Sequence, residues 1–438
     1  MKYLIITVSL AIICTGLIYF SIGKPKQIEP PLPTKSKEKI GFYHYYSGTL
    51  SGGISEMIDE VNKEQTNFVV SARALDHEAF KSMIHTTLDK GNPPELFSYW
   101  AGARVQNLVD QKKLAPIDDL WEKENFDKKF STSVIKAAST YNGSKYLLPI
   151  AQFVVMVFYN KTIFEENGLQ PPTSWEEFIA VCQKLKKNKI TPIALGSRER
   201  WPAQFWMDYL LLRTQPIEYR NRLMNGKAKY TDQEVKKVYQ IWSELLKEKY
   251  FNQNANQLDW AQATQLVCKK DAAMTLMGSW AIQLFEDEKQ CSGPVNNFDF
   301  FPFPTMDMNL PKVALGPIDG IVLSKNSANH DFAKKTLSYF AKQKPQERLS
   351  IGSGALAPSL EVPLSFYSPF KKRMIEEIKS SKYWAFNYDL ATPPRVAELG
   401  MDSFNELIEF PDQYEKILEN VETEAHIIFN EILNNDPK

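Results

Sequence analysis

The stretch Leu96–Trp121, LFSYWAGARVQNLVDQKKLAPIDDLW, predicts the fold class. It opens with an apolar and aromatic run of strand length, is broken by Ala101 and Gly102, and continues with a helical pattern from about 103 to 111. A buried strand that leads through a loop into a helix is the unit of parallel α/β sheets. Because ligands bind beside the carboxyl ends of such strands, Trp100 stands at a candidate site, where a large ring has no packing role if a cleft lies there.

The same unit occurs nearer the amino terminus. Ile40–Tyr46 is a short strand, and the loop 45–53 contains Ser47-Gly48 and Ser51-Gly52-Gly53. A helix follows, because apolar residues recur at i, i+3, i+4 and i+7 from Ile54 to Val61. We therefore predict a ligand loop that includes Tyr46 and Ser47; the alternative is an ordinary strand-to-helix turn.

Two long apolar segments predict passages between two α/β domains. Tyr146–Tyr159 exceeds the usual strand length, and Leu315–Leu323 carries Gly and Pro residues around Asp319. Strands are also expected at 190–195 and 271–276, and the sequence PPTSWEEF predicts a helix that begins with a capping box. No repeat of solenoid period occurs.

Composition narrows the function classes. A chain of 438 residues holds two or three domains, and 43% hydrophobic with 24% charged residues is typical of globular proteins. Lys+Arg and Asp+Glu both number 52, which argues against nucleic acid as a partner. The 26 Phe, 19 Tyr and 9 Trp exceed what a core requires and favour a ligand that stacks on rings.

Residues 1–23 predict export. Uncharged residues 3–22, flanked by lysines, fit either a secretory signal or a single membrane anchor. Both interpretations place the protein in the periplasm or on the outer face of the cytoplasmic membrane. Cys14 follows an Ile where a lipidation site has a small residue, which favours a plain hydrophobic cysteine over a lipidated one. Residues 24–39, rich in Pro and Lys, predict a solvated linker.

Three further cysteines, Cys182, Cys268 and Cys291, are too few for a disulfide scaffold and wrongly spaced for zinc. Two interpretations stay open: a Cys268–Cys291 disulfide formed in an oxidising compartment, or three buried thiols.

Signatures of catalysis are mostly absent. The sequence contains no G-x-S-x-G elbow, no Walker loop and no H-E-x-x-H, and its five histidines lack ligand spacing. We therefore expect no catalytic residues, no metal and no cofactor. Carboxylate pairs for sugar hydrolysis meet through the fold and not through the sequence, so a secreted carbohydrate-active enzyme stays an alternative.

Four tryptophans favour a saccharide ligand. A sugar ring presents an apolar C–H face and a rim of hydroxyls, so its site needs aromatic rings beside polar side chains. Trp100, Trp201, Trp206 and Trp280 stand near strand ends or loops beside such polar groups. Each alone is more often a core residue, and their shared topological position is what favours binding.

Several segments together resemble the extracellular solute-binding proteins of ABC importers, the family that includes maltose-binding protein. They occur in the order seen in that family and span the chain from about Ile40 to the carboxyl terminus. They are LFSYWAGARVQNLVDQKKLAPIDDLW, GSKYLLPIAQFVVMVFYNKTIFEENGL, PPTSWEEF, AAMTLMGSWAIQLF and LGPIDGIVL.

This resemblance implies a two-lobed α/β fold of the periplasmic-binding-protein type II class, with a hinge and discontinuous lobes. The amino-terminal lobe would take residues 40–152 and 318–353, and the carboxyl-terminal lobe 153–317 and 354–438. A monomer would bind a saccharide between the lobes and present it to the membrane permease subunits of an ABC transporter. A sugar sensor is a second alternative.

The resemblance also implies site residues. Trp280 matches the sugar-stacking Trp of the GSW segment, Trp100 follows from the YWAG turn, and Asp319 from the DG of the returning passage. Trp201 lies in a segment similar to the "ALG…WP" of related sugar receptors, whereas Tyr46 and Ser47 match only the location of the first ligand loop. Tyr45-Tyr46 stands where relatives often have tryptophan, which leaves the identity of the sugar open, and the lipobox common among them is missing.

Overall fold

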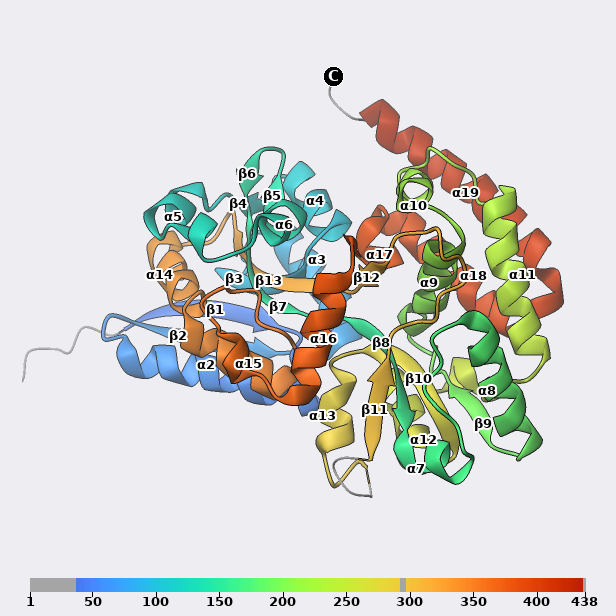
Figure 1. The fold of residues 1–438 in the computed structure, drawn as a ribbon. Coiled ribbons are helices and arrows are strands. Elements are labelled where there is room, and N and C mark those ends of the chain that lie inside the picture. Colours follow the sequence, from blue (N-terminus) through green and yellow to red (C-terminus); the bar gives the residue numbers. More distant parts are fainter. Residues whose placement is uncertain (1–36, 292–296, 436–438) are drawn as a thin grey trace, which may run out of the picture. The chain divides into compact units, whose positions relative to one another are not determined.

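Two larger β-sheets organise the chain, which a computed structural model describes over residues 37–291 and 297–435 (Figure 1). The predicted signal or anchor and most of the predicted linker lie outside the described residues. Among the helices that the structure describes, none combines the length and apolarity needed to span a bilayer. Residues 39–438 belong to one compact unit that contains both sheets.

The first sheet has six strands in the order β2-β1-β3-β13-β4, and β7 also pairs with β13. β1 and β3 are parallel, as predicted, whereas β13 runs antiparallel to β3, β4 and β7. Every residue of β3 and β13 is buried, as expected for central strands covered on both faces. The strands are β1 (Glu38–His44), β2 (Phe68–Ala74), β3 (Leu96–Trp100), β4 (Leu114–Ala115), β7 (Leu147–Gln152) and β13 (Ile318–Ser324).

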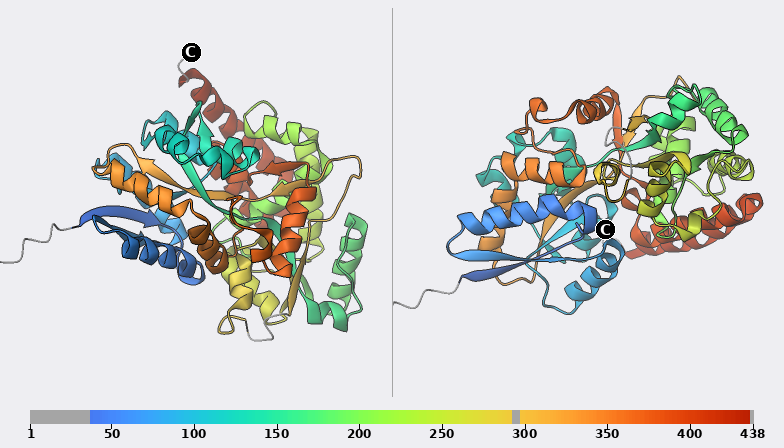
Figure 2. Two further views of the ribbon diagram at one scale, coloured as in Figure 1. Left: turned by 60° about the vertical axis from the view of Figure 1, so that its left-hand side comes forward. Right: turned by 90° about the horizontal axis from the view of Figure 1, so that it is seen from below.

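Helices flank this sheet, and α2 and α15 lie side by side along it (Figures 1 and 2). The apolar stripe predicted from Ile54 to Val61 is the buried face of α2. The helices are α2 (Ser51–Glu64), α3 (His77–Asp89), α4 (Ala103–Asp110), α5 (Asp118–Lys123), α6 (Thr132–Val134), α14 (His330–Phe340) and α15 (Gln343–Ser353).

The second sheet has four strands in the order β11-β8-β10-β9. β10 is parallel to β9 and antiparallel to β8, and β11 is antiparallel to β8. Its strands confirm those predicted at 190–195 and 271–276. The bounds are β8 (Val155–Asn160), β9 (Thr191–Ala194), β10 (Ala272–Gly278) and β11 (Phe298–Phe301).

Helices of the second half pack on this sheet and on one another, with α18 and α19 against α11 (Figure 2). The predicted capping box begins α8. The Ser174 hydroxyl accepts a hydrogen bond from the Glu177 N–H, and the Glu177 carboxylate accepts one from the Ser174 N–H. The helices are α7 (Lys161–Glu166), α8 (Trp175–Lys187), α9 (Gln204–Thr214), α10 (Ile217–Met224), α11 (Gln233–Lys247), α12 (Trp260–Cys268), α13 (Ala281–Glu286), α16 (Pro369–Ser380), α17 (Tyr388–Ala391), α18 (Pro394–Glu409) and α19 (Tyr414–Asn435).

Three stretches of chain pass between the two sheets. The predicted long segment 146–159 is broken between β7 and β8, where the Phe153 N–H donates to the Pro317 carbonyl at 3.0 Å. The return passage runs from β12 (Val313–Leu315) into β13, and β12 pairs with β14 (Tyr383–Ala385). The third stretch follows α15 around Leu356 and leads toward α16. Gln152 and Leu356 join the first and third stretches through two backbone hydrogen bonds of 2.8 Å. The exact lobe boundaries stay predictions.

Cys268 and Cys291 form a disulfide, which resolves the two interpretations left open above. It ties the end of α12 to the chain that leads into β11. Cys182 is a buried free thiol.

Candidate binding site

A cavity of about 350 Å³ lies where strand ends and helix starts meet. Its lining comes from the loop after β1, the start of α3, the ends of β3 and β13, and the segments that begin α9, α12, α13 and α17. Six residues proposed from the sequence line it together: Tyr46, Ser47, Trp100, Trp201, Trp280 and Asp319. Their role in ligand binding stays a prediction.

Trp100 forms one aromatic group with residues of β1 and α3. Parallel pairing of β1 with β3 brings the Tyr45 N–H to the Ser98 hydroxyl at 3.2 Å. The Tyr45 ring then stacks on Trp100, with centroids 4.2 Å apart and 9° between planes, and His77 meets Trp100 edge-on at 5.0 Å. The expectation that Trp100 has no packing role is therefore wrong, because Tyr45 covers one face of the indole.

Trp280 is the centre of a second aromatic group. Trp201 lies against it in a T-shaped arrangement at 5.8 Å, and Phe153 in another at 5.5 Å. Gly278 makes this position possible, since a Cβ there would lie 2.0 Å from the Trp280 ring. The glycine that ends β10 thus lets the indole fold back over the strand end beside the cavity.

Asp319 is held opposite Trp100 by the register of β13 against β3. The Tyr46 hydroxyl donates to its Oδ2 at 3.4 Å, whereas its Oδ1 has no hydrogen-bond partner among the described residues. Burial raises the pKa of Asp319 to about 7, although the Tyr45 and Tyr46 hydroxyls act against that shift. A proton donor on a ligand would stabilise its charged form.

Glu199 is a second carboxylate of the lining, and no local pattern in the sequence predicts it. Burial raises its pKa to about 7, and the nearby charges of Glu78 and Asp259 act in the same direction. The charges of Lys81 and Arg198 act against this shift. Neither adjacent arginine forms an ion pair with Glu199, because Arg198 pairs with Asp259 at 2.8 Å and Arg200 pairs with carboxylates of α18. Its Oε2 is buried without a hydrogen-bond partner in the described part of the chain.

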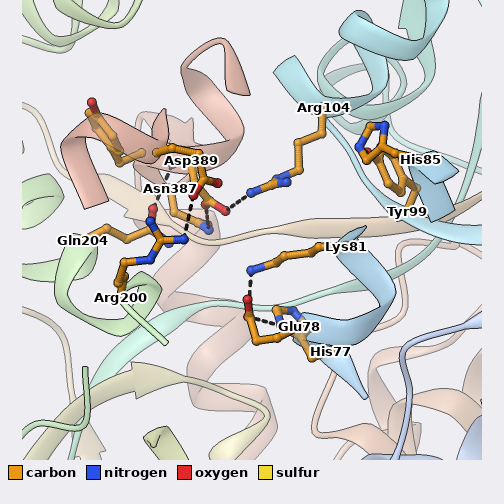
Figure 3. Close-up of polar contacts among 12 residues, drawn as sticks. His77, Glu78, Lys81, His85, Tyr99, Arg104, Arg200, Gln204, Asn387 and Asp389 are labelled. Carbon is orange, nitrogen blue, oxygen red and sulfur yellow. Dashed lines mark hydrogen bonds and ion pairs between the residues drawn. The ribbon is translucent and has the colours of Figure 1, made fainter. Parts of the chain in front are cut away.

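A buried polar chain joins α4, α9 and α17 beside the cavity (Figure 3). Arg104 pairs with the Asp389 Oδ2 at 3.0 Å, and the Asn387 Nδ2 donates to the Asp389 Oδ1 at 3.1 Å. The Asp389 N–H donates to the Gln204 Oε1 at 2.8 Å. The Asn387 Oδ1 and the Gln204 Nε2 are left without partners among the described residues.

The amine of Lys81, which lines the cavity, is already engaged by a carboxylate (Figure 3). Lys81 donates to Glu78 at 2.8 Å, and the His77 Nδ1 lies 3.0 Å from the same oxygen. Burial opposes ionisation of Glu78, but the hydrogen bond from His77 and the charge of Lys81 lower its pKa to about 2. The lysine is therefore not a free anchor for an anionic ligand.

Several residues of the lining carry buried polar atoms that have no hydrogen-bond partner among the described residues. Folded proteins satisfy nearly all buried polar groups, and each exception costs about 1–3 kcal/mol. The unpaired atoms include both acceptors and donors, a mixture that hydroxyls of a ligand can satisfy. The atoms are Asp319 Oδ1, Glu199 Oε2, Asn387 Oδ1, Trp201 Nε1 and Gln204 Nε2.

Trp206, included with the other tryptophans above, does not line the cavity. It is buried and packs edge-on against Phe251 at 5.0 Å and Phe303 at 5.7 Å, so it is a core residue. Within the described ranges, no cluster of three or more His, Cys, Asp or Glu side chains has the geometry to hold a metal ion.

Comparisons with known proteins agree with this architecture. The family model of bacterial extracellular solute-binding proteins matches residues 47–347. An uncharacterized ABC transporter extracellular-binding protein of Pyrococcus horikoshii is 28% identical over 392 residues, 85% of each chain. A probable sugar-binding periplasmic protein of Mesorhizobium japonicum is 23% identical over 75% of this chain and 78% of its own length.

Solved structures extend the comparison. The bacterial solute receptor AcbH, described as having an exclusive preference for β-D-galactopyranose, is 27% identical with a TM-score of 0.83, covering 90% of this chain and all of its own. A chitin oligosaccharide binding protein shares the fold at 22% identity and a TM-score of 0.79, covering 89% of this chain and 99% of its own. Since the family model matches more than half of the sequence, the chain belongs to the bacterial extracellular solute-binding proteins.

Proposed function

We propose that this protein captures a saccharide outside the cytoplasmic membrane and delivers it to the permease subunits of an ABC transporter. The observation that carries the proposal is the cavity itself, which is lined by aromatic groups and by residues that carry unpaired hydrogen-bonding atoms. Rings match the C–H face of a sugar, and the unpaired donors and acceptors match its hydroxyls. The sugar-binding relatives support this choice of ligand.

In this proposal each side of the cavity has its own task. Trp280 and Trp201 provide stacking surface, while Tyr45 stacks on one face of the Trp100 ring and supports it. Asp319 and Glu199 accept hydrogen bonds from sugar hydroxyls. Such bonds favour the ionised carboxylates and release the protons that burial retains in the free protein.

Closure of two lobes around the sugar would couple binding to transport. The passages β7 to β8, β12 to β13, and around Leu356 are the proposed hinges between the lobes predicted from the sequence. A ligand shifts the open-to-closed equilibrium only by its preference for the closed state, so residues that touch it from both lobes set the response. The closed form is what the permease would recognise.

Residues 3–22 are proposed to direct export, as a cleaved signal or a retained anchor. We propose a monomer that binds the sugar without chemical change. The rival is a carbohydrate-active enzyme, which would use the same aromatic cavity to cleave its ligand.

A thermal-shift screen tests the proposal. Purified residues 37–438 are heated with mono- and oligosaccharides, beginning with D-galactose because of the AcbH comparison. A sugar bound only by the native state raises the melting temperature with its concentration. The proposal expects a shift with at least one sugar that is recovered unchanged after incubation. No shift with any sugar, or release of cleaved products, would contradict it.

A further inference from the structure

A second cavity, of about 310 Å³, lies away from the candidate sugar site and shares no lining residue with it. It is enclosed by the turn before α8, the last turn of α9 and the chain that leads from β11 to β12. Its walls are mainly proline, phenylalanine and leucine side chains. They include Pro171, Pro172, Leu212, Phe301, Phe303 and Pro311.

Arg213 brings a positive charge into this apolar space. Only 7% of the residue is exposed. Its Nε donates a long hydrogen bond of 3.4 Å to the Phe303 carbonyl, and its guanidinium lies 5.1 Å from the Tyr209 ring centroid. Its Nη1 is buried without a hydrogen-bond partner among the described residues.

Arg213 differs from the other buried arginines because it has no carboxylate partner among the described residues. Three arginines are buried in the described part of the chain. Arg104 pairs with Asp389 at 3.0 Å and Arg220 with Asp208 at 2.5 Å, whereas Arg213 forms no ion pair there. A buried charge is costly unless it is paired.

The other charged residues that line this cavity do not form an ion pair with Arg213. Asp307 lines the cavity, but its Oδ1 accepts from the backbone and side chain of Asn309. Lys312, the other cation of the lining, is paired with Glu377. The carbonyl end of α9 and the Tyr209 ring offset part of the charge of Arg213 but use none of its terminal donors. Burial lowers the pKa of Arg213, as expected for a buried positive charge without a carboxylate partner.

We propose that this second cavity binds a small apolar molecule that carries one carboxylate. The forked donors of a guanidinium match a carboxylate, and the proline and phenylalanine walls match an apolar body. The volume lies at the lower end of the roughly 300–1,000 Å³ of ligand pockets, which sets the size at about one ring. This site is independent of the proposed sugar site.

Calorimetric titration with benzoate tests the proposal, with benzamide as the neutral molecule of the same shape. Benzoate should bind the wild-type protein at least about tenfold more tightly than benzamide and than inorganic phosphate. The variant Arg213→Met should lose that advantage, and Arg213→Lys should retain part of it, because it keeps the charge but not the fork. Trp280→Ala should bind benzoate as the wild type does.

Three results would overturn the proposal. They are no benzoate binding up to millimolar concentration, equal binding of benzoate and benzamide, and equal benzoate affinity in wild type and Arg213→Met. If Arg213→Met does not fold, the comparison of benzoate with benzamide and the Arg213→Lys variant still decide the question. Failure of this site would leave the sugar proposal untouched, since the two cavities share no lining residue.

Discussion

At the scale of single residues, substitution of Trp280 tests the proposed stacking. We predict that Trp280→Ala weakens sugar binding by about 1–3 kcal/mol, at least about fivefold in affinity, because it removes an apolar ring surface. Calorimetry with the sugar found in the thermal-shift screen measures the change. The matched control is Trp175→Ala, since Trp175 begins α8 and does not line the cavity. Equal affinity in wild type and Trp280→Ala would remove this residue from the site.

Asp319 gives a prediction about pH. Its folded-state pKa is raised by burial from 3.8 to about 7, so between these values the folded protein holds a proton that the unfolded chain lacks. The free energy of unfolding of the wild type therefore contains a contribution from Asp319 that is present at low pH and is lost as the pH rises to about 7. Asp319→Asn cannot ionise. Its free energy of unfolding, relative to wild type, should therefore rise between about pH 4 and pH 7.

Urea unfolding of both proteins at several pH values measures that difference. Taking the difference removes the contributions of groups that titrate alike in both, such as His44, whose pKa burial lowers to about 4. A difference that does not vary with pH, or that falls as the pH rises, would show that the pKa of Asp319 is not raised in the folded protein.

Some residues of the candidate site were predictable and others were not. Trp100 and Trp280 end strand-like runs, so a local pattern identified them. Glu199 and Asn387 have no such pattern: one lies in an irregular loop, and the other precedes the short helix α17. They reach the cavity only through contacts between distant segments, as when Asp389 meets Arg104 across 285 positions of sequence.

At the scale of elements, the disulfide between Cys268 and Cys291 should stabilise the end of α12. It closes a loop with a sequence separation of 23, for which chain entropy predicts about 3 kcal/mol. We predict that complete reduction lowers the free energy of unfolding by about that amount. Chemical denaturation with and without reductant measures it, with thiol titration to verify reduction.

The double variant Cys268→Ser/Cys291→Ser is the control for this experiment. It should show the reduced protein's stability and no response to reductant. If the wild type unfolds at the same denaturant concentration before and after complete reduction, the disulfide does not stabilise the fold.

Element types were predictable where one local signal was strong. The capping box of α8 and the strand-to-helix unit around Trp100 occur as expected. The break between β7 and β8 directly follows Gln152, the last residue of the first segment predicted for the amino-terminal lobe. The contact made at that break, from the Phe153 N–H to the Pro317 carbonyl, was not predictable because Pro317 lies far along the chain. The antiparallel pairing of β13 with β3 was not predictable either, because no local pattern indicates which strand a distant segment will pair with.

At the scale of the whole molecule, the proposed coupling of binding to transport rests on two sheets that are linked by crossing segments of the chain. The cavity takes Trp100 and Asp319 from the first sheet and Trp280 from the segment after β10 of the second. A ligand that contacts both groups favours the arrangement in which they are close. This architecture followed from the sequence through the order of its strands, helices and passages, whereas the positions of the polar partners required the structure.

The central claim is that the aromatic cavity holds a saccharide without changing it. A crystal structure with the sugar that gives the largest thermal shift tests this claim most directly. We predict an intact sugar with one ring face against Trp280 and hydroxyls within about 3.2 Å of the Asp319 and Glu199 carboxylates. A sugar bound elsewhere on the protein, or a cleaved product in the cavity, would contradict the account.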